Sequence, residues 1–350
     1  MVEIEQHVWG MTPEGEAIVL YTMRNAHGAE VRLSNYGAAI VAVTAPDRAG
    51  RMADVVLGYK HPEGYFSDGP AMGKSVGRVA NRIAGGRMTV EGEQYALEVN
   101  NGRNHLHGGS RGFANRLWES RVETNRVVMS LLSEDGDQGY PGELNVEAVF
   151  DFDDDNALEI TYLARTDRTT PVNLTNHVYF NLAGEASGTV LDHCLRLNSS
   201  RVLEMDPWQI PTGRVLEATG TPQDFLSARP LREGVDAEFN HIRDFKGYDH
   251  PFLVDGWQPG ILGEVGELCD PASGRRVEVL SSQPSVMIYT GNWLAGSPES
   301  KSGRRYADYD GVAIECQNYP DAVNHPEFPS PLLRPGETYC QKIVFRFGTC

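Results

Sequence analysis

The sequence has no long apolar run and few cysteines, and both absences narrow the class of protein. No segment approaches the ~20 consecutive apolar residues that a membrane-spanning helix needs. The start, MVEIEQHVWGM, has neither the basic nor the apolar region of a secretory signal. The five cysteines are Cys194, Cys269, Cys316, Cys340 and Cys350. Their odd number, their wide spacing and the lack of a CxxC pair predict that they are free thiols. We therefore expect a cytoplasmic protein with no membrane partner.

Basic residues are also scarce. The chain has 31 Lys and Arg against 48 Asp and Glu, which gives a formal net charge of −17. This charge repels polyanions, because nucleic acids and anionic membranes bind through clustered basic side chains. A nucleic-acid partner is therefore not expected.

Several motifs of common enzyme classes are missing. The sequence has no GxSxG elbow, no Walker A loop and no GxGxxG opening a helix after a strand. None of the cysteines has a recognisable catalytic setting. The pattern thus disfavours serine and cysteine nucleophiles, P-loops and dinucleotide-binding folds.

Helical periodicity is scarce, and short β-patterned runs recur instead. Together with 37 Gly and 20 Pro, and with DDDN and EGE as hairpin turns, they predict an all-β fold, a large antiparallel β-sandwich. The runs are EVRLSNYGAAIVAVTA, RMTVEGEQYALEV, RVVMSLLS, LNVEAVFDFDDDNALEITYLA, RRVEVLSS, SVMIYTGNW and QKIVFRF.

The chain shows no repeat and no linker that would divide it, so we expect residues 1–350 to form a single domain. The stretch 218–250 has too little apolar periodicity for a core strand. We expect it to lie on the surface, where it could close over a ligand.

Reactive side chains gather in a few short segments. NLTNHVYFNL, residues 173–182, surrounds His177 with amides and hydroxyls, although a histidine in a strand is more often a hydrogen-bonded core residue. Asn81 and Arg82, the pair His105 and His107, Asp249 of GYDHPF, and Glu315 of IECQNYPDA are the other candidates. For Arg82, Arg87 and Asp249, a surface ion pair is an equally good interpretation.

His105 and His107 would share one face of a strand, because side chains alternate with period two. Two such imidazoles can hold a divalent cation, but the following GGSRGF supplies no carboxylate ligand. Hydrogen bonding to a polar ligand is therefore favoured, and no metal is expected.

Glu315 follows the apolar run VAI and precedes a turn, so it is either a solvated edge residue or a partly desolvated carboxylate with raised proton affinity. The second interpretation suits a general base. Amides, imidazoles, an arginine and two carboxylates together match a polyhydroxylated neutral ligand, which indicates a sugar.

These segments resemble the aldose 1-epimerases, also called galactose mutarotases, in the same order over nearly the whole chain. The resemblance is carried by GRVANRIAGGRMTVEGEQYAL, NNGRNHLHGG, TNHVYFNLAG, YDHPF, YTGNWL and ECQNYPDAVNHPEFPSPLLRPGETY. It implies a large single-domain antiparallel β-sandwich, a monosaccharide substrate and no cofactor. A monomer or a homodimer is expected.

The resemblance makes His177 the general acid and Glu315 the general base. It also implies that the sugar hydroxyls are bound by Asn81, Arg82, His107, Asp249 and Gln283, with Tyr179 lining the site and His105 supporting the loop. Cys316 follows the base Glu315 at a position where the family often has Thr, which could change the extent to which the Glu315 carboxylate is desolvated.

In the implied reaction, Glu315 takes the C1 hydroxyl proton of an aldohexose such as D-glucose or D-galactose, and protonated His177 delivers one to the ring oxygen. Reclosure on the other carbonyl face gives the opposite anomer. The ordinary pKa values favour a charged Glu315–His177 pair. Three alternatives stay open, namely a mutarotase specific for another aldose, a non-catalytic sugar-binding sandwich and a glycoside hydrolase that uses Asp249 with Glu315.

Overall fold

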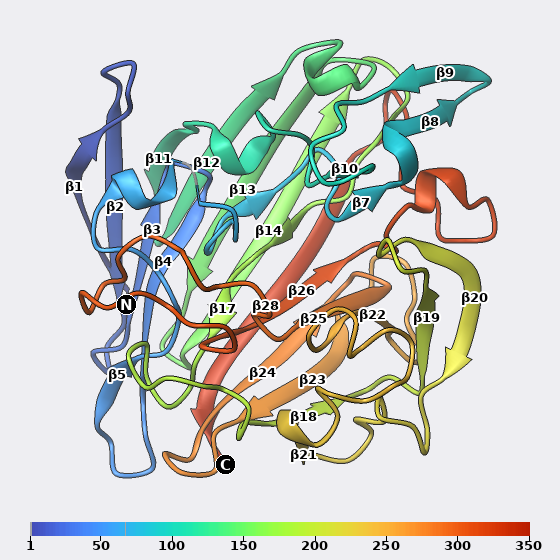
Figure 1. The fold of residues 1–350 in the computed structure, drawn as a ribbon. Helices are drawn as coiled ribbons and strands as arrows, with labels where there is room; N and C mark the ends of the chain where they lie inside the picture. The colour runs from blue at the N-terminus through green and yellow to red at the C-terminus, as the bar shows by residue number, and fades with distance from the viewer. Residues whose placement is uncertain (1, 67) are drawn as a thin grey trace.

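A computed structural model describes residues 2–66 and 68–350, and its regular structure is mostly antiparallel β-strand (Figure 1). The expectation of an all-β antiparallel fold is confirmed. The runs singled out in the sequence form strands, and both DDDN and EGE lie at hairpin turns between paired strands.

The largest sheet has nine strands and contains the C-terminal strand near its centre. Its order is β11-β12-β13-β14-β28-β24-β23-β18-β21. The strands are β11 (Glu119–Glu123), β12 (Arg126–Ser133), β13 (Leu144–Phe152), β14 (Ala157–Thr166), β18 (Cys194–Leu197), β21 (Arg229–Pro230), β23 (Gly263–Cys269), β24 (Arg275–Ser281) and β28 (Tyr339–Thr349).

A six-stranded sheet lies in front of it in Figure 1, and a five-stranded sheet stands at its side. The six-stranded order is β17 (Tyr179–Phe180), β26 (Val312–Gln317), β25 (Ser285–Tyr289), β22 (Asp249–Leu253), β19 (Arg201–Met205) and β20 (Pro211–Glu217). The five-stranded sheet comprises β1 (Glu3–Met11), β2 (Ala17–Arg24), β3 (Glu30–Ser34), β4 (Ala39–Pro46) and β5 (Met52–Asp54).

Short two-stranded pairs and 3₁₀ turns complete the fold. The pairs are β6 (Ser75–Val76) with β16 (Thr175–Asn176), β7 (Arg82–Ile83) with β10 (His105–Leu106), β8 (Arg87–Val90) with β9 (Glu93–Ala96), and β15 (Thr170–Pro171) with β27 (Leu332–Leu333). The 3₁₀ turns are η1 (Pro62–Tyr65), η2 (Ala84–Gly86), η3 (Phe113–Asn115), η4 (Asp137–Gly139), η5 (Leu231–Glu233) and η6 (Ala322–Asn324).

Period-two patterning explains how the long strands form a sandwich. In β13 every second side chain, from Leu144 to Phe152, is buried, and the alternate positions are more exposed. The two large sheets meet through such buried faces, since the ring of Phe180 on β17 contacts those of Phe345 and Phe347 on β28. The main core therefore lies between β28 and the six-stranded sheet.

The stretch 218–250 contains only short strand and 3₁₀ pieces, as its weak periodicity predicts. The expectation that this stretch lies on the surface is only partly met, however. Several of its apolar side chains are fully buried in the main core, including Phe225, Leu231, Ile242 and Tyr248. Sequence periodicity missed these contacts because they come from isolated apolar residues in turns.

The prediction of five free thiols is wrong at two positions. Cys269 and Cys350 form a disulfide with a Cα–Cα distance of 6.7 Å across a sequence separation of 81. The reason is the sheet order: β28 pairs with β24 and β24 with β23, so the chain end returns beside Cys269. Cys194, Cys316 and Cys340 are free.

No helix among the described residues is long and apolar enough to cross a membrane.

Two buried histidines are held in their neutral form by the backbone. The Leu182 N–H donates to Nε2 of His193, and the Asp249 N–H donates to Nδ1 of His250. Each ring nitrogen must be unprotonated to accept these bonds. Burial lowers the pKa of both imidazoles from 6.5 to about 4.

We expect stability to fall as the pH drops from about 6.5 towards 4. In this window the unfolded chain protonates His193 and His250 while the folded chain does not, so the free energy of unfolding decreases with decreasing pH. The full loss below pH 4 is about 3 kcal/mol per histidine. Urea unfolding at half-unit pH intervals measures it.

The matched variants are His193→Gln and, as a surface control, His61→Gln, whose parent residue is exposed. The first should weaken the pH dependence, because of the two histidines only His250 still contributes, and the second should leave it as in the parent protein. An unfolding free energy that does not change between pH 6.5 and 4.5 would contradict this account.

Candidate functional site

The register of the six-stranded sheet brings His177 and Glu315 together. Tyr179 pairs with Ala313 and Phe180 with Val312. His177 precedes β17, and extending this antiparallel register by two residues places it opposite Glu315. The Nε2 atom of His177 lies 3.4 Å from Oε1 of Glu315. An imidazole and a carboxylate separated by 138 positions thus meet directly.

Both side chains are buried. The exposed fraction is 6% for His177 and 2% for Glu315, so Glu315 is not a solvated edge residue. Glu315 Oε2 and His177 Nδ1 have no hydrogen-bond partner within the described part of the chain. Because buried polar atoms are nearly always hydrogen-bonded, these two atoms are suited to a polar ligand.

Three aromatic rings surround His177. Its ring centroid lies 4.9 Å from that of Tyr179, 5.4 Å from that of His107 and 6.4 Å from that of Tyr289. The hydroxyl of Tyr179 donates to the Pro70 carbonyl, so this residue offers the imidazole its ring rather than its hydroxyl. The rings fix the orientation of His177.

Asn81 and His107 hold each other in place. The Asn81 N–H donates to Nδ1 of His107 over 3.1 Å, and the His107 N–H donates to the Asn81 carbonyl. Both residues have positive φ values, 63° and 53°. Because Nδ1 accepts a bond, the proton of the neutral ring lies on Nε2, which is left as a donor for a ligand.

The positive φ at His107 also corrects a prediction. His105 and His107 were expected to share one face, but β10 ends at Leu106 and the left-handed backbone at His107 breaks the alternation. His105 bonds instead to the Glu98 carbonyl and the Tyr140 hydroxyl. It supports the loop and lies against different groups from His107.

Arg82 and Asp249 are the charged groups beside the pair. Both interact electrostatically with Glu315, and Arg82 is buried. Nε of Arg82 donates to Asn101, and Nε2 of Gln209 donates to Asp249. The interpretation of Arg82 as a surface residue is therefore wrong, and its guanidinium lies near two carboxylates.

Gln283 is engaged differently from the other candidates. Its Nε2 donates to the Leu174 carbonyl and to the Tyr339 hydroxyl, which ties the start of β25 to neighbouring segments. Among the described residues, Gln283 forms no hydrogen bond with His177 or Glu315.

Two residues on the same face as Glu315 were not among the predicted site residues. Met287 lies directly opposite Glu315 in the ladder and is buried, so it helps to desolvate the carboxylate. Gln317, two positions after Glu315, is fully buried, and both of its amide atoms lack a partner in residues 2–66 and 68–350. The i+2 spacing from a candidate base was the signal available for Gln317.

Burial dominates the electrostatics of the pair. Desolvation lowers the pKa of His177 to about 4 and raises that of Glu315 well above its ordinary value. Asp249 raises the pKa of Glu315 further, and Arg82 opposes this. The dry site favours the uncharged forms, in contrast to the charged pair expected from ordinary pKa values.

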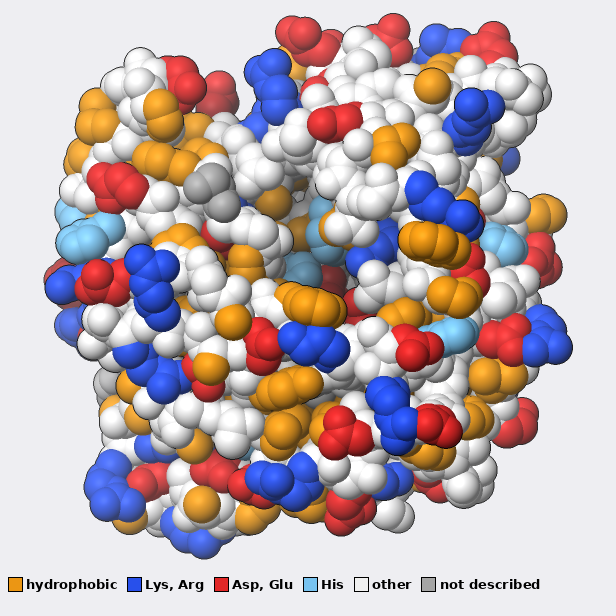
Figure 2. Space-filling model, in the orientation of Figure 1, with side chains coloured by type: hydrophobic (Ala, Val, Ile, Leu, Met, Phe, Trp, Pro, Cys, Tyr) orange, Lys and Arg blue, Asp and Glu red, His pale blue; other side chains and the backbone are white. Residues whose placement is uncertain are grey.

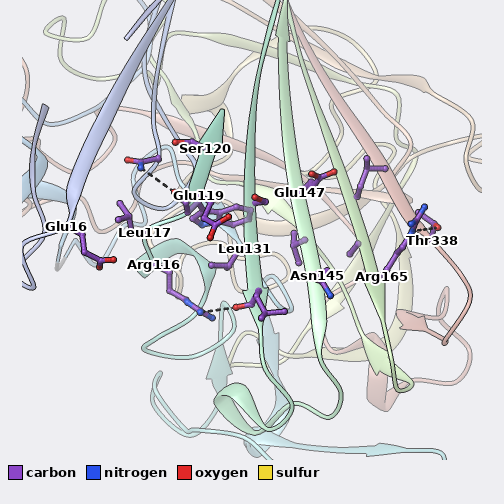
Figure 3. Close-up of a pocket in the computed structure, with 17 residues that line it drawn as sticks. Glu16, Arg116, Leu117, Glu119, Ser120, Leu131, Asn145, Glu147, Arg165 and Thr338 are labelled. Carbon is purple, nitrogen blue, oxygen red and sulfur yellow. Dashed lines mark hydrogen bonds between the residues drawn. The ribbon is translucent and has the colours of Figure 1, made fainter. Parts of the chain in front are cut away.

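A hollow opens near the centre of one face of the molecule, with histidine side chains at its base (Figure 2). A separate groove of about 860 Å³ lies over β11–β14 and is lined by residues such as Arg116, Glu119, Glu147 and Arg165 (Figure 3). That groove contains neither His177 nor Glu315. Its size alone therefore does not make it the reactive site.

The chemistry available at the pair is proton transfer to and from a neutral polar ligand. Within the described ranges, no three His, Cys, Asp or Glu side chains are grouped as metal ligands would be. One proton donor and one acceptor within 3.4 Å can serve two oxygens on the same carbon. Arg82, Asp249 and His107 add donors and acceptors for hydroxyl groups.

The family model and the similar known proteins agree on one family. The aldose 1-epimerase family model matches residues 19–346. The chain is 41% identical to a galactose mutarotase of Bos taurus, covering 99% of each chain. It is 38% identical to an aldose 1-epimerase of Escherichia coli, covering 96% of this chain and 97% of that one.

Solved structures agree with the fold. An aldose epimerase homologue from C. elegans superposes with a TM-score of 0.86 at 30% identity, covering 100% of this chain and 99% of the other. A galactose 1-epimerase from Lactobacillus acidophilus gives the same TM-score at 26% identity and the same coverage.

The loop that carries His107 depends on a glycine, which provides a test. A Cβ on Gly108 (φ +81°) would lie 2.0 Å from the Gly77 carbonyl oxygen, whereas one on Gly102 (φ +58°) meets nothing within 4 Å. Gly102→Ala should cost about 1–2 kcal/mol for the left-handed backbone alone. Gly108→Ala should cost clearly more. Urea unfolding compares them, and equal losses would contradict the close approach.

Proposed function

This chain belongs to the aldose 1-epimerase family and is an isomerase that interconverts the anomers of aldohexoses, and we propose that His177 and Glu315 are its proton-transfer pair. The observation that carries the proposal is the 3.4 Å contact between Nε2 and Oε1 in a buried site. The hydroxyl oxygen and the ring oxygen of a cyclic aldose are bonded to the same carbon. A donor and an acceptor that serve them must therefore be neighbours.

The pair shares one proton. The charged state, Glu⁻ with His⁺, and the uncharged state, protonated Glu with neutral His, contain the same number of protons, so burial changes where the proton rests and not how many there are. A sugar hydroxyl that donates to Glu315, together with the positive charge of Arg82, favours the carboxylate. Substrate binding thus shifts the proton towards His177.

Ring opening then needs one transfer at each oxygen. Glu315 accepts the proton of the C1 hydroxyl while His177 donates one to the ring oxygen, and the bond between C1 and the ring oxygen breaks. Rotation about C1–C2 turns the other face of the aldehyde towards the ring hydroxyl. The two residues then exchange roles, and closure gives the opposite anomer.

The remaining polar residues hold the sugar in place. We assign the Nε2–H of His107, the guanidinium of Arg82, the amide of Asn81 and the carboxylate of Asp249 to sugar hydroxyls. Tyr179 supports the imidazole from one face. The hydrogen bonds of Gln283 suit a supporting role at the start of β25 better than contact with the sugar.

Family membership and the acid–base pair together favour an epimerase over a silent sugar-binding sandwich. A glycoside hydrolase that uses Asp249 and Glu315 has less support, because the relatives are epimerases and mutarotases. The proposal includes no cofactor. It also treats residues 1–350 as one domain, because the main core draws on residues from Tyr21 to Phe347.

Replacing either member of the pair should abolish most of the activity and keep the fold. We expect Glu315→Gln and His177→Asn each to lower kcat by about 10²- to 10⁴-fold, since each removes one proton transfer. Polarimetry of freshly dissolved α-D-glucose and α-D-galactose measures the rate. Circular dichroism verifies folding.

The matched control is Glu278→Gln, a strand carboxylate paired with Arg346. This variant should mutarotate both sugars as the parent protein does. Near-normal rates for Glu315→Gln would exclude the assigned role of the carboxylate.

The pH dependence of kcat/KM should be bell-shaped because only the form with one shared proton is active. A second proton binds as the pH falls through about 4, where His177 titrates. The shared proton is lost as the pH rises through the raised pKa of Glu315. Rates corrected for spontaneous mutarotation, with samples returned to neutral pH to verify recovery, give the profile. An acid limb near pH 6.5 would show that His177 is not desolvated.

A further inference from the structure

Three of the five cysteines lie together at the edge of the nine-stranded sheet. Cys194 on β18 is directly opposite Cys269 on β23 in the antiparallel register. Cys269 is in turn bonded to Cys350, the last residue of the chain. In Figure 1 the C-terminus lies beside the ends of these strands. A free thiol is thus the cross-strand neighbour of a disulfide.

The separation of Cys194 and Cys269 suits a bond between them. Directly opposed residues in an antiparallel pair have Cα atoms about 4.5–5.5 Å apart. Disulfides join residues whose Cα atoms are about 4.4–6.8 Å apart. Cys269 can therefore bond to either Cys194 or Cys350 without rearrangement of the strands.

The three cysteines differ in exposure. Cys350 is exposed, whereas Cys194 and Cys269 are half-buried on the sheet. Burial and the carboxylates of Glu233, Asp270 and Asp192 raise the pKa of the Cys194 thiol. Since the thiolate is the attacking species, this environment makes the attack of Cys194 slow at neutral pH.

We propose that Cys194, Cys269 and Cys350 form a thiol–disulfide exchange site that releases the C-terminal thiol for modification by a low-molecular-weight disulfide. The thiolate of Cys194 attacks Sγ of Cys269, the Cys269–Cys350 bond breaks, and Cys350 leaves as a thiolate. The proton lost by Cys194 balances the one that Cys350 can take up. The released Cys350 thiolate then attacks the small disulfide, which loses one small thiol.

Exchange preserves one disulfide in this part of the sheet but changes which segments it joins. The Cys269–Cys350 bond ties the chain end to β23, whereas a Cys194–Cys269 bond ties β18 to β23 and leaves the chain end free. The exposed end then has a thiol that the closed form does not offer. The site lies outside the His177–Glu315 pair and does not depend on the proposed function.

The test uses Cys340→Ser protein, because Cys340 is an exposed free thiol that would react independently. The protein is incubated with oxidised glutathione in the absence of reduced thiol, blocked with N-ethylmaleimide and mapped by mass spectrometry of non-reduced tryptic peptides. We expect glutathione on Cys350 together with a Cys194–Cys269 cross-link. Adding Cys194→Ser should reduce the modification of Cys350 at least tenfold.

A second variant tests the alternative bond by itself. In Cys340→Ser protein that also has Cys350→Ser, oxidised glutathione should produce the Cys194–Cys269 cross-link. Mutarotase activity of every variant serves as the folding control. Equal modification of Cys350 with and without Cys194, or no Cys194–Cys269 cross-link when Cys350 is absent, would overturn the proposal.

Discussion

The proposed proton-transfer pair depends on the pairing of one short strand, β17, with β26. Tyr179 is opposite Ala313, and His177, two residues earlier, contacts Glu315, two residues later; a shift of one residue would turn the carboxylate towards the apolar core that contains Ile314 and Cys316. Burial of the opposite face of β26 therefore specifies the geometry of the reactive face. The core and the site are two sides of the same strand.

Desolvation gives this contact its chemical character. In water an imidazole and a carboxylate would exchange protons with the solvent, but here Met287 and the rings of Tyr179 and Tyr289 exclude it. In the proposed mechanism the proton is then retained by the pair. Arg82 and Asp249 adjust the balance from either side, because one stabilises the carboxylate of Glu315 and the other destabilises it.

Much of the architecture could be predicted from local patterns. In β13 the alternation of apolar and polar residues reflects which side chains are buried, and the residues of the following turn reflect the backbone conformation that the turn needs. The pairing of His177 with Glu315 could not be derived in this way, since nothing local specifies which strands become neighbours; resemblance to a family supplied it. The prediction that His105 and His107 share one face was wrong because a single residue, His107, has a left-handed backbone conformation. The disulfide was missed because Cys350 reaches Cys269 only through the sheet order.

The site divides its components between rigid and irregular backbone. Glu315 stands within β26, while Asn81, directly before β7, and His107, directly after β10, occupy left-handed positions. With Asn81 and His107 assigned to sugar hydroxyls as proposed, insertions or substitutions in those loops can reshape the surroundings of individual hydroxyl groups without displacing the carboxylate. The fold thereby gives selectivity and reactivity separate mutational routes, so one scaffold can diversify towards new sugars while its acid–base chemistry stays intact.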